Sequence, residues 1–260
     1  VEMGGAEADP SEIVLRWGVA DKGESILWPA YAWTTEDSVV TGGSRIVYQP
    51  GEVREIQLDW RHTPQPELSL PRPRGYLVTA GWPQIEEVVR GHGLRAYRVT
   101  TATSLEVETI RLSKPEFAAS SYQGVVMVED FDVSRRSERR DIPANSLWIP
   151  ADQPAFEIAV QLFEPEAPDS LIRWGALSSV FERKIYVGLD VLEGLAREML
   201  ENPEVRDAWQ AAIADEEFAR SWRARYLWWY QRTPYWDESV GLMPVYRILA
   251  TPQLDLGPWP

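Results

Sequence analysis

The chain has 260 residues and a formal net charge of −14. This length allows one large domain or two modest ones with a substantial core, while the acidic balance argues against a nucleic-acid partner, because phosphate binding requires clustered Lys and Arg. The chain contains no cysteine, which excludes disulfides, thiolate catalysis and cysteine-ligated metal sites but does not determine the compartment.

The first residues and the charge runs carry little functional signal. Arg135-Arg136 and Arg139-Arg140 form the densest basic run, but Glu138 and Asp141 lie beside them, so we interpret it as a solvated strand edge. No stretch approaches the ~20 apolar residues of a membrane helix, so we expect no membrane span. The start is acidic, without the apolar core of a signal peptide. Val1 is not an initiator methionine, so we expect a piece of a longer protein.

The first quarter of the chain reads as β structure. We interpret residues 1–10 as a linker and expect four or five short strands between residues 11 and 62. The clearest is the alternation of Ile56, Leu58 and Trp60 with polar residues, which is typical of an antiparallel strand with one wet face. Residues 63–74 are rich in proline, and we expect an extended boundary there.

A strand–helix–strand pattern follows this boundary. Tyr76–Val78 predicts a short strand, Trp82-Pro83 opens a helix, and residues 94–99 form a second strand, which together predict a βαβ-like unit. The unit has no glycine-rich phosphate loop, so a nucleotide site is not expected. We predict further strands at residues 105–112, 124–133 and 140–149.

The stretch from Asn145 to Trp174 joins the β-rich part to a helical part. We expect Asp152 to cap a helix whose first turn contains Pro154, and we expect Pro165 and Pro168 to end it.

Helical spacing dominates after this stretch. Asn202-Pro203-Glu204 is a strong helix start, and one helix from Asp215 is expected to run until Pro234 ends it. Residues 243–249 predict a last strand, and we interpret residues 255–260 as a tail. The fold class that this pattern favours is α+β, with antiparallel strands first and a three-helix cluster near the C-terminus.

Hydrolytic chemistry has little support in the residues. Only His62 and His92 are present, neither with a carboxylate three residues later, so we expect no zinc site and no serine triad. Glu164, Glu166 and Asp169 form the best local carboxylate cluster, but nothing signals desolvation, and we favour a solvated acidic loop. A two-carboxylate hydrolase stays as the last-ranked alternative.

Many short blocks, in order, resemble the C-terminal, non-catalytic part of bacterial zinc carboxypeptidase-like proteins of the carboxypeptidase A superfamily. The resemblance covers roughly residues 73–247 and is carried by the following segments: Pro73-Arg74-Gly75-Tyr76-Leu77-Val78, His92-Gly93, Leu105-Glu106-Val107-Glu108, Tyr122-Gln123-Gly124, Trp148-Ile149-Pro150-Ala151-Asp152-Gln153-Pro154, Leu162-Phe163-Glu164-Pro165-Glu166, Asp169-Ser170, Pro234-Tyr235-Trp236-Asp237-Glu238 and Pro244-Val245-Tyr246-Arg247. The family's His-x-x-Glu zinc motif is absent, since Gln65 and Arg95 stand at the third position after the two histidines.

This resemblance implies an accessory region rather than the peptidase itself. It places residues 1–70 as a β-rich segment that follows a catalytic domain, and residues 71–260 as an α+β accessory domain. It implies no cofactor in this chain, zinc only in the parent catalytic domain, that domain and a peptide substrate as partners, and a periplasmic or secreted location. Without the peptidase domain, apolar surface should be exposed around Trp28, Trp33 or Trp236.

The 13 tryptophans leave a second hypothesis open. Large aromatic side chains usually fill a core, but exposed rings can bind sugars or peptides. The alternative is therefore a stand-alone module that binds a peptide or a glycan, and its candidate binding residues are Tyr235, Trp236 and Asp237.

Overall fold

The computed structural model describes residues 11–184 and 186–259, so the linker expected at residues 1–10 lies outside the described part. The chain divides into two compact units. The first ends at Arg72 and also takes in Glu166–Pro168, and the second comprises residues 73–165 and 169–259. Within the described residues, no helix is long and apolar enough to cross a bilayer.

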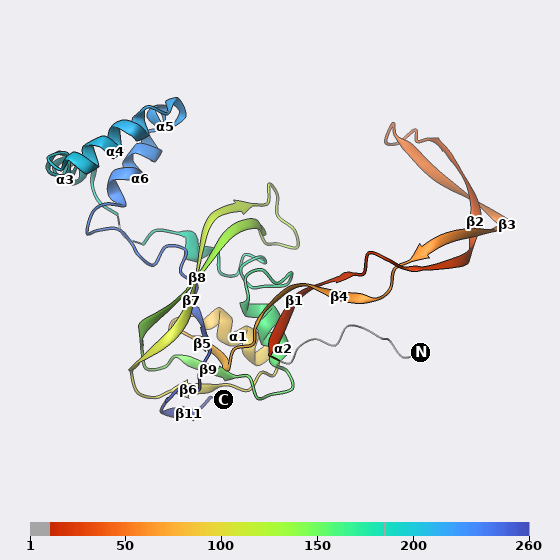
Figure 1. Ribbon diagram of the computed structural model, residues 1–260, viewed down its shortest axis with the longest axis horizontal. Coiled ribbons are helices and arrows are strands. Elements are labelled where there is room, and N and C mark those ends of the chain that lie inside the picture. Colours follow the sequence, from red (N-terminus) through yellow and green to blue (C-terminus); the bar gives the residue numbers. More distant parts are fainter. Residues whose placement is uncertain (1–10, 185, 260) are drawn as a thin grey trace. The chain divides into compact units, whose positions relative to one another are not determined.

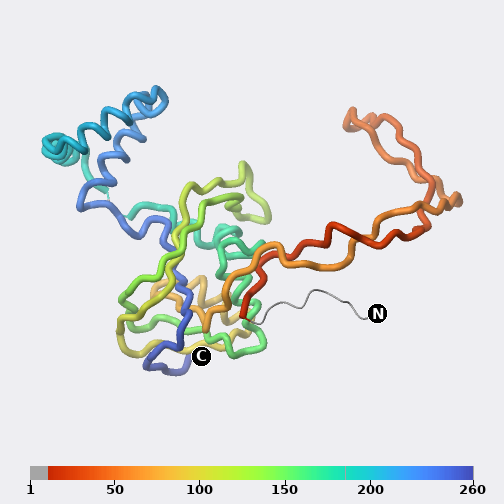
Figure 2. Tube along the Cα trace, in the orientation of Figure 1, coloured from red at the N-terminus to blue at the C-terminus, as the bar shows by residue number. Residues whose placement is uncertain are grey.

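The first unit is built on one antiparallel ribbon. Figure 2 shows the chain running along the first two strands and returning along the next two, which lie beside them. The inner pair is β1 (Glu12–Val19) with β4 (Pro64–Pro71), and the outer pair is β2 (Glu24–Asp37) with β3 (Ser44–Trp60). The Ala20 amide donates to the Thr63 carbonyl oxygen at 2.9 Å and joins the two pairs.

The expectation of four or five short strands was wrong here, whereas the proline-rich segment is extended as expected and the first unit ends within it, at Arg72. The outer strands are long, and the proline-rich segment is itself a strand, β4. In a two-stranded ribbon each strand has one unpaired edge, so a proline can turn its missing amide donor outward without breaking the ladder. Pro29 lies opposite Glu55 and Pro66 opposite Trp17 within these pairings.

The second unit contains a seven-stranded sheet in which every neighbouring pair is antiparallel (Figure 1). In sheet order its strands are β11 (Leu256–Pro258), β6 (Tyr97–Val99), β9 (Leu147–Pro150), β5 (Gly75–Val78), β10 (Val245–Ile248), β7 (Thr103–Phe117) and β8 (Val128–Ile142).

The predicted strand–helix–strand unit is present, but it is split. Helix α1 (Pro83–Gly91) connects β5 to β6, and β9 lies between these two strands and pairs with both. Both partners run antiparallel to β9, so β5 and β6 are parallel to each other.

Sheet register separates an apolar face from a face that carries charge. Tyr97, Trp148, Leu77 and Tyr246 lie opposite one another in a single row. Alternate residues of a strand point to opposite faces, so this row shares one face. It forms a buried core with four further side chains, namely Val99, Val107, Ile142 and Ile248.

Helix α2 (Phe156–Phe163) covers the other face of the sheet. Tyr76 of β5 contacts two of its residues, with ring centroids 5.5 Å from Phe156 and 5.3 Å from Phe163. The expected cap was wrong, because Ala155 precedes the helix without a side-chain hydrogen bond. Asp152 instead forms an ion pair with Arg95 at 2.7 Å.

Helices gather near the C-terminus, after a short 3₁₀ turn η1 (Ser178–Phe181). They are α3 (Leu189–Met199), α4 (Pro203–Ile213), α5 (Glu216–Arg220) and α6 (Trp222–Tyr230). The predicted start at Asn202 is confirmed, since its side chain accepts a hydrogen bond from the Glu204 amide at 2.9 Å.

Two expectations for this part of the chain were wrong. The single helix expected from Asp215 is broken at Ser221, whose side chain accepts from the Ala224 amide at 3.1 Å and starts α6 anew. A serine side-chain oxygen can accept the hydrogen bond of an amide that lacks a helical partner, so the break costs little free energy. The expected tail contains β11, which extends the sheet beside β6. The α+β class is confirmed for the described residues.

Candidate functional site

Register across the sheet brings charged residues together on the face beneath α2. Tyr76 of β5 lies opposite Arg247 of β10, and Arg247 lies opposite Glu108 of β7. Glu108 in turn lies opposite Ser137 of β8, so Arg135, two residues before it, is on the same face. Four polar side chains from four adjacent strands therefore converge below one helix.

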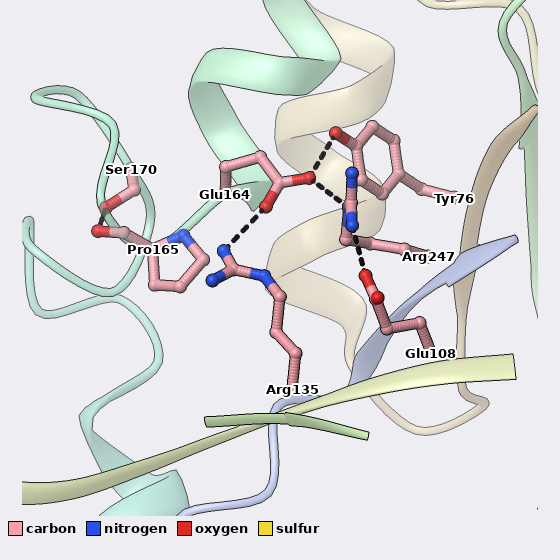
Figure 3. Close-up of polar contacts among 7 residues, drawn as sticks. All are labelled: Tyr76, Glu108, Arg135, Glu164, Pro165, Ser170 and Arg247. Atoms are coloured by element: carbon pink, nitrogen blue, oxygen red, sulfur yellow. Dashed lines mark hydrogen bonds and ion pairs between the residues drawn. The ribbon is translucent and has the colours of Figure 1, made fainter. Parts of the chain in front are cut away.

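Glu164 enters this group from the end of α2 (Figure 3). Its carboxylate accepts hydrogen bonds from the Tyr76 hydroxyl at 2.7 Å, from Arg247 Nε at 2.8 Å and from Arg135 Nη2 at 3.2 Å. Ser170 holds the turn after the helix by donating to the Pro165 carbonyl oxygen at 3.0 Å. Glu164 is 0% exposed, so the helix end is fixed to the sheet by charge-assisted hydrogen bonds.

The positive and negative charges within the cluster compensate one another. Arg247 is 1% exposed and also forms an ion pair with Glu108. Burial works to lower the pKa of Arg247, but the charges of Glu164 and Glu108 outweigh it and raise that pKa. Burial, and then the charge of Glu164, raise the pKa of the Tyr76 hydroxyl well above its usual value.

The cluster is better suited to holding the fold than to catalysis. Glu164 is completely buried and accepts three hydrogen bonds, which leaves no route for a substrate to its carboxylate. The expectation of a solvated acidic loop was wrong for Glu164, although Asp169 is exposed. A signal was present in the sequence: Arg247 is a lone charge inside the apolar strand Val245–Ile248, and a buried charge requires a partner.

The candidate binding residues near the C-terminus have three different environments. Tyr235 is exposed, whereas Trp236 is half-buried and packs edge-on against Tyr230 with ring centroids 5.1 Å apart. Asp237 is buried and accepts hydrogen bonds from the Lys184 amide at 2.7 Å and from the Ser239 hydroxyl at 2.6 Å. Together they do not form an exposed aromatic platform.

Local hydrogen bonds account for the charge state of Asp237. Burial works to raise the pKa of its carboxyl, but the hydrogen bonds from Ser239 and from the Lys184 amide outweigh burial and lower that pKa. This explains why a buried carboxylate is tolerated at the end of the helical region, where it anchors a turn.

Trp236 also lines a groove of about 660 Å³ between the β7–β8 region and the segment after α6. Four cations of β7 and β8 line this groove, namely Arg111, Lys114, Arg136 and Arg140. Two of them lie near carboxylates, Lys114 at 2.8 Å from Asp132 and Arg140 at 3.7 Å from Glu138, so these ion pairs neutralise part of the positive charge of the groove.

The histidines lie at separate places, each with a local role. His62 stacks on Trp60 with ring centroids 4.2 Å apart, and His92 follows the last turn of α1. Within residues 11–184 and 186–259, no group of three or more His, Asp or Glu side chains is close enough to hold a metal ion. The assignment of zinc to a separate catalytic domain stays a prediction.

The outer ribbon carries an apolar surface that is left open. Residues directly opposite each other in an antiparallel pair share a face, and the pairs Ile26–Leu58 and Trp28–Ile56 fall on one side, with Trp60 next to them. We call this surface, made of Ile26, Trp28, Ile56, Leu58 and Trp60, the ribbon apolar face. Trp28 is 53% exposed and Trp60 47% exposed.

The opposite side of the same ribbon mixes polar residues with three exposed apolar ones, Leu27, Tyr31 and Val53. There β3 presents Glu55, Gln57 and Asp59, and Gln57 donates to the Ser25 hydroxyl at 2.8 Å. Trp28 and Trp33 are both exposed. Two of the three tryptophans that we expected at the surface are therefore at the surface. Trp236 is not, because it packs against Tyr230.

Comparison with known proteins identifies a distant relationship over part of the chain. The sequence is 28% identical over 114 residues to Carboxypeptidase 2 of Trichophyton rubrum, and 29% identical over 115 residues to Carboxypeptidase 2 of Trichophyton tonsurans and of Trichophyton equinum. Each match covers 44% of this chain but 21% of the relative's length. No protein-family model and no solved structure matches the sequence. The chain therefore contains a carboxypeptidase-related region.

Proposed function

We infer that this chain is a non-catalytic accessory region of a carboxypeptidase-related protein and that it packs against the peptidase domain of that protein. The observation that carries this inference is the ribbon apolar face, where Trp28 and Trp60 are about half exposed. An isolated two-stranded ribbon is marginally stable in water and needs a second layer against its apolar side. The inference supplies that layer from outside the described residues.

The comparisons support the peptidase domain as this layer. The matched segment corresponds to about a fifth of Carboxypeptidase 2 in each relative, so those proteins contain much more chain than the part related to this one. We place the region C-terminal to a bacterial zinc peptidase domain, with zinc bound in that domain. A periplasmic or secreted location and a role in shaping access of peptide substrates belong to the same proposal.

Contact area sets the expected strength of this packing. Burying the exposed part of one large aromatic side chain contributes about 1–2 kcal/mol, at roughly 25 cal/mol per Å². The loss of Trp28 and Ile56 from the interface should therefore weaken association by at least about tenfold, which corresponds to ~1.4 kcal/mol.

The test uses the complete reading frame that encodes this chain. Its peptidase domain is expressed separately, and its association with this chain is measured by calorimetry for the native sequence, for Trp28→Thr/Ile56→Thr and for Tyr31→Thr. Tyr31 is the matched control, because it is 56% exposed and lies on the other side of the same strand. Threonine retains β-propensity at each position.

We expect the double variant to lose at least tenfold in affinity and the Tyr31→Thr variant to bind as the native chain does. Equal weakening by both variants would show that the ribbon apolar face is not the contact surface. A reading frame without a peptidase domain, or removal of C-terminal residues from peptides by this chain alone in a chelator-sensitive reaction, would overturn the accessory assignment.

A further inference from the structure

Strand β8 is the last strand of the seven-stranded sheet, and among the described residues only β7 pairs with it. Contacts with Arg173 cover the start of β8: the Val128 amide donates to the Arg173 carbonyl oxygen at 2.9 Å, and Arg173 Nη1 donates to the Glu129 carbonyl oxygen at 2.8 Å. The strand then continues through residues 130–142. Within the described part of the chain, the outer backbone edge of this stretch has no strand beside it, so its N–H and C=O groups are available for pairing.

The densest run of arginines in the chain occupies this edge. Residues 134–142 contain four arginines and two carboxylates. Arg135 points into the buried cluster beneath α2, whereas Arg136 and Arg139 are exposed. Neither exposed arginine has an ion-pair partner among the described residues, and Arg140 lies 3.7 Å from a carboxylate of the same strand. The open edge therefore carries a local excess of positive charge on a chain whose net charge is −14.

The surface is hollowed on either face of this edge. Alternate residues of a strand point to opposite faces, so Arg136 and Arg140 lie on one face and Arg139 on the other. The groove of about 660 Å³ that Trp236 lines receives Arg136 and Arg140. A second hollow, of about 490 Å³, is lined by Arg139 and Arg140. An added strand would present its own side chains alternately to the two faces, so carboxylates on it can reach arginines on either.

We propose that the outer edge of β8 pairs with an extended, acidic segment of another protein. Main-chain hydrogen bonds to the open edge supply affinity, and Arg136, Arg139 and Arg140 select carboxylate side chains by charge-assisted hydrogen bonds. The bound stretch is internal to its chain, because the edge recognises backbone amides and side-chain carboxylates and no terminal group.

The same features disfavour other occupants of the edge. Antiparallel pairing of two β8 strands would place arginines opposite arginines, and like charges in that position are destabilising, so a second copy of this chain is a poor partner. A nucleic acid has no peptide groups to pair with the edge, and the net charge of −14 opposes its approach.

The experiment titrates the native full chain with the capped peptide acetyl-Thr-Glu-Val-Glu-Thr-Glu-Val-Thr-amide, whose glutamates all lie on one face when it is extended. Calorimetry measures affinity, and amide hydrogen exchange locates the contact. One control peptide has glutamine in place of every glutamate, which removes the charges. A second is N-methylated along its backbone, which removes the donors for strand pairing but retains the charges.

Three variants of the chain test the role of the arginines. Arg136→Gln removes a cation from the edge and should weaken binding of the acidic peptide about threefold, because exposed charge pairs contribute modestly. Arg54→Gln is the matched control, since Arg54 is exposed on strand β3 and lines neither hollow. Glu138→Gln removes the carboxylate that competes for Arg140 and should tighten binding about threefold.

The acidic peptide should bind at least about tenfold more tightly than the glutamine peptide, the N-methylated peptide should not bind measurably, and new protection should appear at β8 amides within residues 130–142. Absence of binding, equal binding of either control peptide, protection confined to other strands, or equal effects of Arg136→Gln and Arg54→Gln would each overturn the proposal. The titration contains no peptidase domain, and Trp28→Thr/Ile56→Thr should bind the peptide as the native chain does. Failure here is therefore separable from failure of the accessory assignment.

Discussion

Replacing Arg247 by methionine removes a cation that touches both Glu164 and Glu108 beneath α2. Methionine has a similar length and can fill the space that the Arg247 side chain occupies between β10 and α2. The change leaves the Glu164 carboxylate fully buried, with hydrogen bonds from Tyr76 and Arg135 (Figure 3). The loss should therefore appear as a large decrease in the stability of the seven-stranded sheet.

The structure sets the size of this decrease. Breaking a buried ion pair by removing one partner costs about 3–5 kcal/mol, because the other charge stays buried. Two donors remain on Glu164, and the Glu108 side chain is 17% exposed and reaches water. We therefore expect the lower end of the range, about 3 kcal/mol.

Hydrogen exchange of the β5 and β10 amides is the appropriate assay, since a chain with two compact units need not unfold in one step. Arg98→Met serves as the control. Arg98 pairs with Glu86, but both side chains are partly exposed, so its removal should lower the opening free energy by about 1 kcal/mol. Adding Glu164→Gln to Arg247→Met should recover part of the loss, because the uncompensated charge is then gone.

A decrease for Arg247→Met that is no larger than that for Arg98→Met would refute this reasoning. It would mean that the Glu164 cluster contributes specificity of packing at most, and that apolar contacts alone hold α2 on the sheet.

Three further substitutions test local features. A hydrogen bond from Arg98 lowers the pKa of Glu86, so the stability advantage of the native chain over Glu86→Gln should be complete above about pH 4.3 and should disappear as pH falls through the lowered folded-state pKa. Urea midpoints of the two proteins measured between pH 7 and pH 2 should converge, and a constant gap would contradict the assignment. Gly241→Ala should destabilise by about 2–4 kcal/mol, because φ is 73° there and an added Cβ would overlap the Leu112 carbonyl oxygen. Gly194→Ala, in open space on α3, should stabilise by up to about 1 kcal/mol in thermal melts, and the same sign for both glycines would refute the backbone argument.

Local signals predicted much of the fold. The helix start at Trp82-Pro83 and the cap at Asn202 depend on neighbours within one turn, and both are present. The strand–helix–strand pattern was also readable, but the insertion of β9 between its two strands was not. That placement depends on pairing between residues far apart in the chain, which periodicity does not encode.

Long-range pairing also explains what was missed at the buried cluster. Glu164 and Arg247 are brought together by sheet register and by the angle at which α2 ends, neither of which is local. The cluster of Glu164, Glu166 and Asp169 suggested solvent exposure by composition alone. The isolated arginine in an otherwise apolar strand was the better guide, because a charge that cannot reach water must be met by another.

The two ends of the outer ribbon are joined by the hydrogen bond that the Ala20 amide donates to the Thr63 carbonyl oxygen. A tight turn between Ala20 and Thr63 could replace the outer ribbon without changing the path of β1 or β4. The entropy of closing a loop changes slowly with its length. The outer ribbon can therefore become longer or shorter in evolution almost independently of the seven-stranded sheet. The length of the outer ribbon can thus differ between related proteins without a change in the seven-stranded sheet.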